Sequence, residues 1–234
     1  MNLTRSLIIV AIAEIAFVVA TRVVLHYLPW TSIEAEAIRT AMRIATAGLY
    51  WWLLKPVILS RQPDFASLTS PALLLALLLF LSIPVLVGTY GLKPSVALMF
   101  AITSIPVAIK EEFLFRGIMQ NLLTERFGAL KAVLTTSTIF TLWHVGVWDP
   151  SVWTFGEIFL ASVIIGFIYL RSGSIAVVIV LHAAYDAIYS FTPLLTPPFN
   201  PNWGFVPMLA AVALVYAWAQ HSGNLRLPFF RRDS

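Results

Sequence analysis

The sequence predicts an all-α fold: one transmembrane domain, residues 1–234, built as a polytopic bundle of about eight helices with both termini in the cytoplasm. Three observations predict it: the composition, the spacing of the apolar runs and the charges between them. Of the 234 residues, 59% are hydrophobic and 11% are charged, and the mean hydropathy is +0.87. Because soluble domains carry about 25% charged residues, this chain has too few charges to cover a soluble surface.

Eight apolar runs, separated by short polar or Pro/Gly-rich stretches, predict the helices. They cover residues 6–28, 36–59, 71–89, 95–123, 130–148, 152–170, 174–195 and 205–220. Each is close to the ~20 residues that cross a bilayer. The second run is unusual because it contains Arg39 and Arg43. The first run continues past Glu14 to Leu28, so we expect a retained helix rather than a signal peptide.

The charges between the runs test the number of crossings. If the N-terminus is inside, the inner segments carry most of the basic residues: Arg5, Lys55, Arg61, Arg126, Lys131, Arg171, Arg226, Arg231 and Arg232. The outer loops carry Lys93 and Asp149, and three arginines near the first outer turn weaken the pattern without reversing it. Since basic residues gather on cytoplasmic loops, an even number of crossings fits, and eight fits best. The same rule explains the net charge of +4 without a nucleic-acid partner.

Four charges fall close together in the fourth predicted helix, in the segment KEEFLFR, residues 110–116. A charge at the bilayer centre is unfavourable by about 2.5–3.5 kcal/mol on insertion scales, so the cluster needs an explanation. Glu112 and Arg116 stand at i,i+4 with the acid first, the favourable order for an ion pair on one helix face. Glu111 is rotated about 100° from Glu112. We therefore expect Glu112 to be structural and Glu111 to be available for chemistry.

Two later helices carry histidines. His144 lies in the fifth, while His182 and Asp186 share one face of the seventh at i,i+4. Counted at 1.5 Å per residue from the predicted inner ends, the depths are roughly 18 Å for Glu111, 21 Å for His144, 12 Å for His182 and 18 Å for Asp186. A single histidine in an apolar helix is usually a core residue. Four ionisable groups in one membrane layer predict a functional site.

Three short motifs occur in order on these helices. Residues 111–117 read EEFLFRG and fit EExxxR, residues 140–144 read FTLWH and fit FxxxH, and residues 182–186 read HAAYD and fit Hxxx(N/D). Together they resemble the CAAX protease and bacteriocin-processing family, also called CPBP or Abi, which includes prenyl-protein endopeptidases of the Rce1 type. The resemblance covers about residues 95–195.

This resemblance implies an intramembrane endopeptidase that hydrolyses a peptide bond inside or beside the bilayer. By motif position, Glu111 would be the general base that activates water, and His144 would help to hold that water. His182 and Asp186 would polarise the scissile carbonyl or stabilise the oxyanion. The positions expected to support the site are Glu112, Arg116 and Phe140.

The last motif position bears on the choice between a metal-free glutamic protease and a metalloprotease. Many family members have Asn there, whose amide is a hydrogen-bond donor, whereas Asp186 donates only when protonated. The set Glu111, His144, His182 and Asp186 would also make a reasonable zinc site, so zinc is the alternative cofactor. No HExxH motif is present. We favour the metal-free mechanism, with no cofactor.

Other functions fit the residues less well. The chain has no cysteine, no GxSG serine context and no GxGD motif, which disfavours the other intramembrane protease classes. Two alternatives do not involve proteolysis: a non-catalytic membrane scaffold, immunity or regulatory protein of the same fold, and a proton- or ion-coupled transporter. A scaffold has no need of the base and both histidines. A transporter is expected to show paired broken helices in two halves, which are not evident here.

The implied partners are a peptide or protein substrate in or at the membrane and the lipid bilayer itself. The location would be the cell membrane of a prokaryote or the endoplasmic reticulum membrane of a eukaryote. Nothing in the sequence specifies recognition of a prenyl chain or an oligomeric state. Glu14 and Arg22 of the first helix could pair within the bundle or across a dimer.

Overall fold

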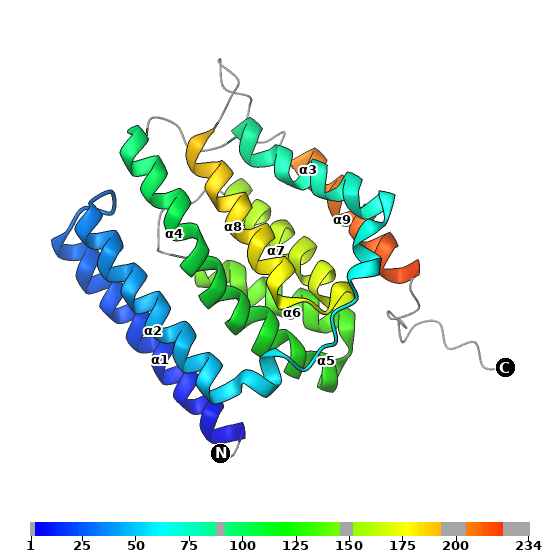
Figure 1. Ribbon diagram of the computed structural model, residues 1–234, viewed down its shortest axis with the longest axis horizontal. Coiled ribbons are helices and arrows are strands. Elements are labelled where there is room, and N and C mark those ends of the chain that lie inside the picture. Colours follow the sequence, from blue (N-terminus) through cyan, green and yellow to red (C-terminus); the bar gives the residue numbers. More distant parts are fainter. Residues whose placement is uncertain (1–2, 88–91, 146–151, 193–204, 222–234) are drawn as a thin grey trace.

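The computed structural model describes residues 3–87, 92–145, 152–192 and 205–221, and helices make up nearly all of this part of the chain (Figure 1). The α-helices are α1 Leu3–Tyr27, α2 Ile33–Ile58, α3 Pro71–Val87, α4 Pro94–Glu112, α5 Asn121–Phe127, α6 Ala129–Trp143, α7 Val152–Ser172, α8 Ile175–Phe191 and α9 Phe205–His221. A short 3₁₀ helix, η1, covers Phe65–Thr69, and a π-helix, η2, covers Phe113–Gln120. No strand occurs among these described residues, so the expected all-α class is confirmed.

The fourth predicted helix is one continuous rod of three elements. α4, η2 and α5 follow one another without a break, so the described residues form eight rods, the number of apolar runs. One boundary differs clearly, because α6 ends at Trp143 where a helix over 130–148 was expected. The expected ends of two other segments, residues 89 and 195, lie outside the described residues.

Local sequence explains where several helices begin and end. The side chain of Ser32 accepts a hydrogen bond from the backbone N–H of Ala35 and so caps α2. Ser174 caps α8 in the same way, through the N–H of Val177. Gly128 separates α5 from α6 with a φ of 83°. Only glycine adopts that conformation readily, so the rod turns back at this residue.

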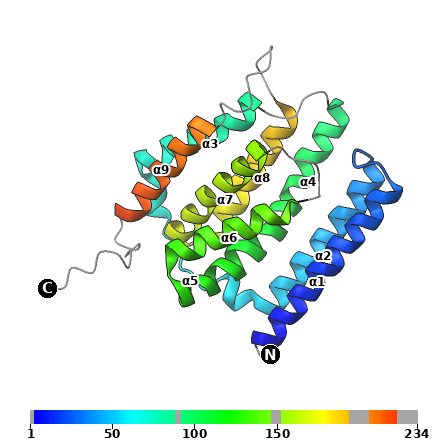
Figure 2. The ribbon, with the colours of Figure 1, turned by 180° about the vertical axis from the view of Figure 1, so that it is seen from behind.

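The α1–α2 hairpin lies at one edge of the molecule, and α3 and α9 pack together at the opposite edge (Figure 1 and Figure 2). The larger hydrophobic core joins α3, α7, α8 and α9 around Phe80 and Ile164. A smaller core joins the hairpin to η2 and α6 around Tyr50 and Phe115. α4 packs on α8 and on α2, so the helix that carries the charged segment lies between the hairpin and the rest of the bundle.

The ends of several helices meet on one face. In the loop after α2, the N–H of Asp64 donates to the carbonyl of Ser172 at 2.7 Å, and Arg171 donates to the carboxylate of Asp64. That hydrogen bond from Arg171 lowers the pKa of Asp64. Near the end of α9, the indole N–H of Trp218 donates to the carbonyl of Ser67 at 3.2 Å. The ends of α2, α7 and α9 therefore lie together, as expected for three segments assigned to the inner side.

The apolar helices differ in length. Among the described residues, Leu3–Tyr27 and Thr154–Ser172 are long and apolar enough to cross a membrane. Four further apolar helices are between 10 and 17 residues long: Pro71–Leu86, Ala129–Trp143, Ile175–Phe191 and Val206–Gln220. α1 also exposes a stripe of large apolar side chains: Ile8, Ile12, Ile15, Val19 and Val23. An exposed stripe of this kind is favourable against lipid rather than water, which supports a membrane protein.

The basic residues inside α2 share one acid. The buried carboxylate of Glu36 lies 2.5 Å from Nη1 of Arg43 and 3.0 Å from Nη1 of Arg39. An isolated charge in this position would be strongly unfavourable, whereas paired charges are tolerated. The two arginines that made the second apolar run unusual therefore pair with the same acid of their own helix.

Candidate active site

The charged segment lies at a change of helix type, where α4 continues as the π-helix η2. π-helices bond residue i to i+5 and are frequent at functional sites. Two polar side chains of η2 reach α7. Arg116 donates to the hydroxyl of Ser162 at 2.8 Å and to its carbonyl at 3.0 Å, and Gln120 donates to the carbonyl of Gly166 at 2.9 Å. These hydrogen bonds fix η2 against α7.

The guanidinium of Arg116 is fully buried among complementary groups. Its Nη1 lies 3.3 Å from Oε1 of Glu112, the expected i,i+4 ion pair. The guanidinium also stands 5.0 Å from the ring centroid of Phe140, within cation–π distance. Both members of the pair are buried, so removal of either would leave an unpaired charge and destabilise the fold.

His182 of α8 links both glutamates of the first motif. Its Nδ1 lies 2.7 Å from Oε1 of Glu112, while its Nε2 lies 3.9 Å from Oε2 of Glu111 and 3.5 Å from Oδ2 of Asp186. An ionised carboxylate only accepts hydrogen bonds, so Nδ1 carries a proton and donates to Glu112. The ring is thereby held with Nε2 facing Glu111 and Asp186. The contact between Glu112 and His182 was not expected from the sequence.

The three acids around His182 differ in their access to the outside. The side chain of Glu112 is fully buried, that of Glu111 is 16% exposed and that of Asp186 is 38% exposed. Glu112 therefore lies on the buried side of the imidazole of His182, and Glu111 and Asp186 lie on its accessible side. Of the two adjacent glutamates, Glu111 is therefore the more accessible.

His144 approaches the same region through Phe140. The ring centroid of Phe140 lies 4.8 Å from that of His144 and 6.0 Å from that of His182. Nδ1 of His144 lies 2.8 Å from the carbonyl oxygen of Phe140, and a carbonyl only accepts, so Nδ1 donates. The expectation that His144 lies within a helix is wrong. Its N–H bonds the carbonyl of Thr141, three residues back, in the tight turn that ends α6.

The alternative zinc site would need Glu111, His144, His182 and Asp186 to converge on one point. Within the described part of the chain, no group of three or more His, Asp or Glu side chains is placed to hold a metal ion. Nδ1 of His182 is already bound to Glu112, and the carboxylates of Glu111 and Asp186 both face Nε2 of that ring.

Sequence reasoning missed a second buried cluster of charge. Nζ of Lys110 lies 2.8 Å from the carboxylate of Glu14 in α1, and the hydroxyl of Tyr50 in α2 donates to the same carboxylate. All three side chains are buried. Glu14 therefore pairs within the bundle, with Lys110 and not with Arg22. The signal in the sequence was the acid that interrupts the first apolar run.

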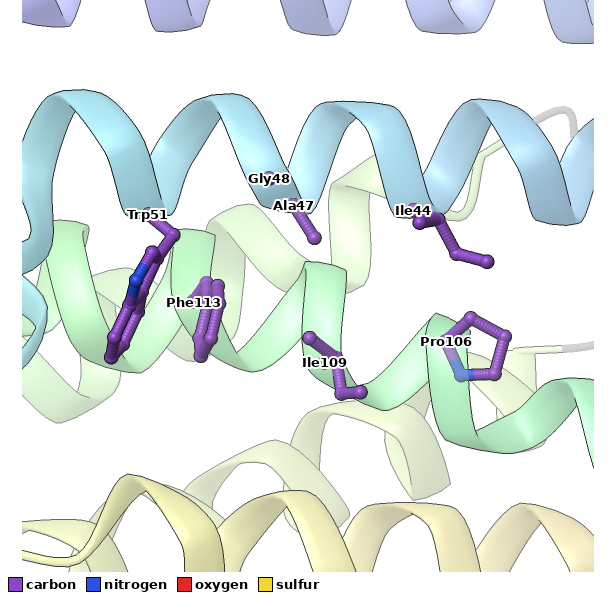
Figure 3. Close-up of a pocket in the computed structure, with 7 residues that line it drawn as sticks. All are labelled: Ile44, Ala47, Gly48, Trp51, Pro106, Ile109 and Phe113. Atoms are coloured by element: carbon purple, nitrogen blue, oxygen red, sulfur yellow. The ribbon is translucent and has the colours of Figure 1, made fainter.

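An apolar groove runs between α2 and the fourth helix (Figure 3). Its volume is about 390 Å³, and it is lined by Ile44, Ala47, Gly48, Trp51, Pro106, Ile109 and Phe113. At one end the rings of Trp51 and Phe113 stack with their centroids 5.6 Å apart. The groove thus lies along the helix that carries the two glutamates, but none of its lining residues is charged.

The described part of the chain is thus a bundle of helices that encloses Glu112, Arg116 and His182. The family model described as type II CAAX prenyl endopeptidase, Rce1-like, matches residues 93–188, the segment that contains all three motifs. The resemblance inferred from those motifs is thereby confirmed for this segment of the chain. No curated protein and no solved structure matches the chain.

Proposed function

We propose that this protein is a multi-pass membrane endopeptidase that hydrolyses a peptide bond of a membrane-associated substrate with water activated by Glu111. The observation that carries the proposal is the placement of His182. Glu112 holds its Nδ1 at 2.7 Å, while Nε2 faces Glu111 and Asp186. A carboxylate base beside a fixed N–H donor supplies the parts needed to activate water and to bind an oxyanion.

The reaction would proceed by water attack on the scissile carbonyl. Glu111 would accept a proton from water as the oxygen attacks, with His144 helping to hold that water. Since Nδ1 of His182 already donates to Glu112, a second proton on Nε2 would make the ring an imidazolium. That Nε2–H would donate to the oxyanion. Asp186, whose carboxylate lies 3.5 Å from that nitrogen, would only position the neighbouring groups. When the C–N bond breaks, the proton on Glu111 would pass to the leaving amine, so that water is the only co-substrate.

The proposed location is the bilayer, with eight crossings and both termini on the cytoplasmic side. The exposed apolar stripe on α1 and the match to a family of membrane proteases support it. The meeting of the ends of α2, α7 and α9 on one face also supports the predicted alternation of inner and outer loops.

The test compares protein N-termini in the membrane fraction of cells that express the wild type, Glu111→Gln or Glu125→Gln at equal levels. Glu125 is a matched control because it is an exposed acid on the same rod. Loss of a general base lowers rates by about 10²–10⁴-fold. Cleavage sites present with the wild type should therefore vanish with Glu111→Gln and persist with Glu125→Gln. Identical sets of N-termini in all three strains would refute the endopeptidase and favour the non-catalytic scaffold.

A further inference from the structure

The first helix is held to the bundle by a narrow stripe. Its buried residues are Ser6, Val10 and Glu14, spaced four apart on one face, and the rest of α1 is exposed or half-buried. The carboxylate of Glu14 reaches Lys110 of α4 at 2.8 Å and also accepts the hydroxyl of Tyr50 in α2. A buried acid on an edge helix thus has partners on two other helices.

The ammonium of Lys110 lies next to the proposed chemistry. It stands 4.0 Å from the ring centroid of Phe17 in α1 and 5.6 Å from that of Trp143 in α6, both within cation–π distance. Lys110 directly precedes Glu111, and Trp143 directly precedes His144. One buried charge therefore contacts the segments that carry the proposed base and the proposed water-holding histidine.

A buried ammonium needs a counter-charge, and Glu14 supplies it. Without that charge, the nearest acid along the chain is Glu111, since Glu112 is already bound to Arg116 and His182. Lys110 and Glu111 lie about 100° apart on the helix and do not face each other in the wild type. The lysine stem is long and flexible, and without Glu14 the ammonium would swing around the helix to reach Glu111. An ammonium bound there would occupy the lone pair with which Glu111 takes a proton from water.

We propose that Glu14, with Tyr50, is a positioning residue of the active site. It binds the Lys110 ammonium and thereby keeps Glu111 open to water. This inference rests on the proposed function. It gives the α1–α2 hairpin, which lies outside the segment matched by the family, a part in catalysis.

The test uses purified full-length protein in detergent. The variants are Glu14→Gln, Lys110→Met, the double variant of both, and Tyr50→Phe, which removes a single hydroxyl. The matched control is Glu36→Gln, because Glu36 is another buried, ion-paired acid of the hairpin. The probe is a quenched fluorescent peptide that spans the site most dependent on Glu111 in the cell experiment. The measured quantities are kcat, KM and Tm.

The expected result separates positioning from stability. Glu14→Gln should lower kcat at least about tenfold and leave KM unchanged, since Glu14 does not touch substrate. Tyr50→Phe should lower kcat by a smaller factor. Lys110→Met and the double variant should stay near the wild-type kcat, because no ammonium remains to bind Glu111. Glu36→Gln should lower Tm and leave kcat unchanged.

Two outcomes would overturn the inference about Glu14, and a third would overturn the proposed function as well. If Glu14→Gln and Glu36→Gln both lower Tm without loss of kcat, Glu14 is structural only and the inference is overturned. If the double variant is as slow as Glu14→Gln, Lys110 does not act by turning to Glu111, and the inference is again overturned. If wild-type cells show no site that depends on Glu111, the proposed function itself fails and the inference fails with it.

Discussion

His182 lies between acids whose surroundings differ. Glu112 is fully buried and bonded to both Arg116 and His182, so its charge has a fixed position. Glu111 and Asp186 border Nε2 of the same ring and are partly exposed. A carboxylate that binds one imidazole nitrogen fixes the orientation and tautomer of the ring, as in protease triads and metal sites. One acid thus orients the histidine, and the other two can meet substrate.

Replacement of Asp186 by Asn distinguishes the two mechanisms open to this donor set. In the metal-free mechanism, Asp186→Asn keeps the shape of the side chain and adds a permanent N–H donor, so most of the activity should survive. If Asp186 were a zinc ligand, a neutral amide would bind the metal much more weakly, and activity should fall by about 100-fold or more. The measurement is the initial rate of peptide cleavage.

Chelation provides the independent control for that substitution. We expect cleavage by the wild type to be indifferent to a strong chelator and to added zinc. Stoichiometric zinc in active purified protein, lost together with activity in Asp186→Asn, would contradict the metal-free mechanism.

At the scale of elements, the helices could be predicted because apolar runs of bilayer length have few alternatives to a helix. The π-helix could not, because the pair Glu112 and Arg116 at i,i+4 is equally compatible with an ordinary α-helix. The end of α6 before His144 was also missed, since the apolar run continues past the point where the backbone turns.

Pairs on one helix could be predicted from spacing, and pairs between helices could not. The contacts of Glu112 with Arg116 and of His182 with Asp186 are both present. The contacts of Glu112 with His182 and of Glu14 with Lys110 depend on how separate helices pack, which spacing along the chain does not encode. The contacts on one helix of the candidate site could therefore be predicted, whereas its contacts between helices could not.

A glycine in the turn between α7 and α8 gives a test at this scale. Gly173 has a φ of 64°, and a Cβ there would lie 2.2 Å from the carbonyl oxygen of Gln62. Gly173→Ala should lower the free energy of unfolding by at least about 2 kcal/mol, because left-handed backbone and steric overlap both oppose the side chain. The Tm in detergent should fall by roughly 4 °C or more.

Gly48→Ala is the control for that substitution. Gly48 is helical and faces open space in the groove wall (Figure 3), with no atom within 4 Å of an added Cβ. Its replacement should leave Tm unchanged or raise it, since Ala is favoured over Gly inside a helix by about 0.5–1 kcal/mol. Equal Tm values for the two variants would contradict the close contact between the loop after α2 and the turn after α7.

At the scale of the whole molecule, the centre of the bundle carries the motifs and the edges support it. The segment matched by the family ends within α8 and leaves out α1, α2, α3 and α9. The α1–α2 hairpin supplies Glu14 and Tyr50 to the charged helix, and α3 and α9 complete the larger core around α7. Substitutions at either edge are therefore expected to reach the site through packing rather than through substrate contact.

The orientation of this bundle in the membrane can be tested with single cysteines, because the natural chain has none. Glu34 at the start of α2 and Gln62 after its end are both exposed. The 26 residues of α2 span about 39 Å, which is more than the ~30 Å thickness of the hydrocarbon core of a bilayer. In intact cells, a membrane-impermeant maleimide should label Glu34→Cys and should label Gln62→Cys only after the membrane is opened. The reason is that Gln62 lies on the face where basic segments gather, which stays cytoplasmic. Labelling of both cysteines from the same side would show that α2 does not cross the membrane, and the eight-crossing topology would be wrong.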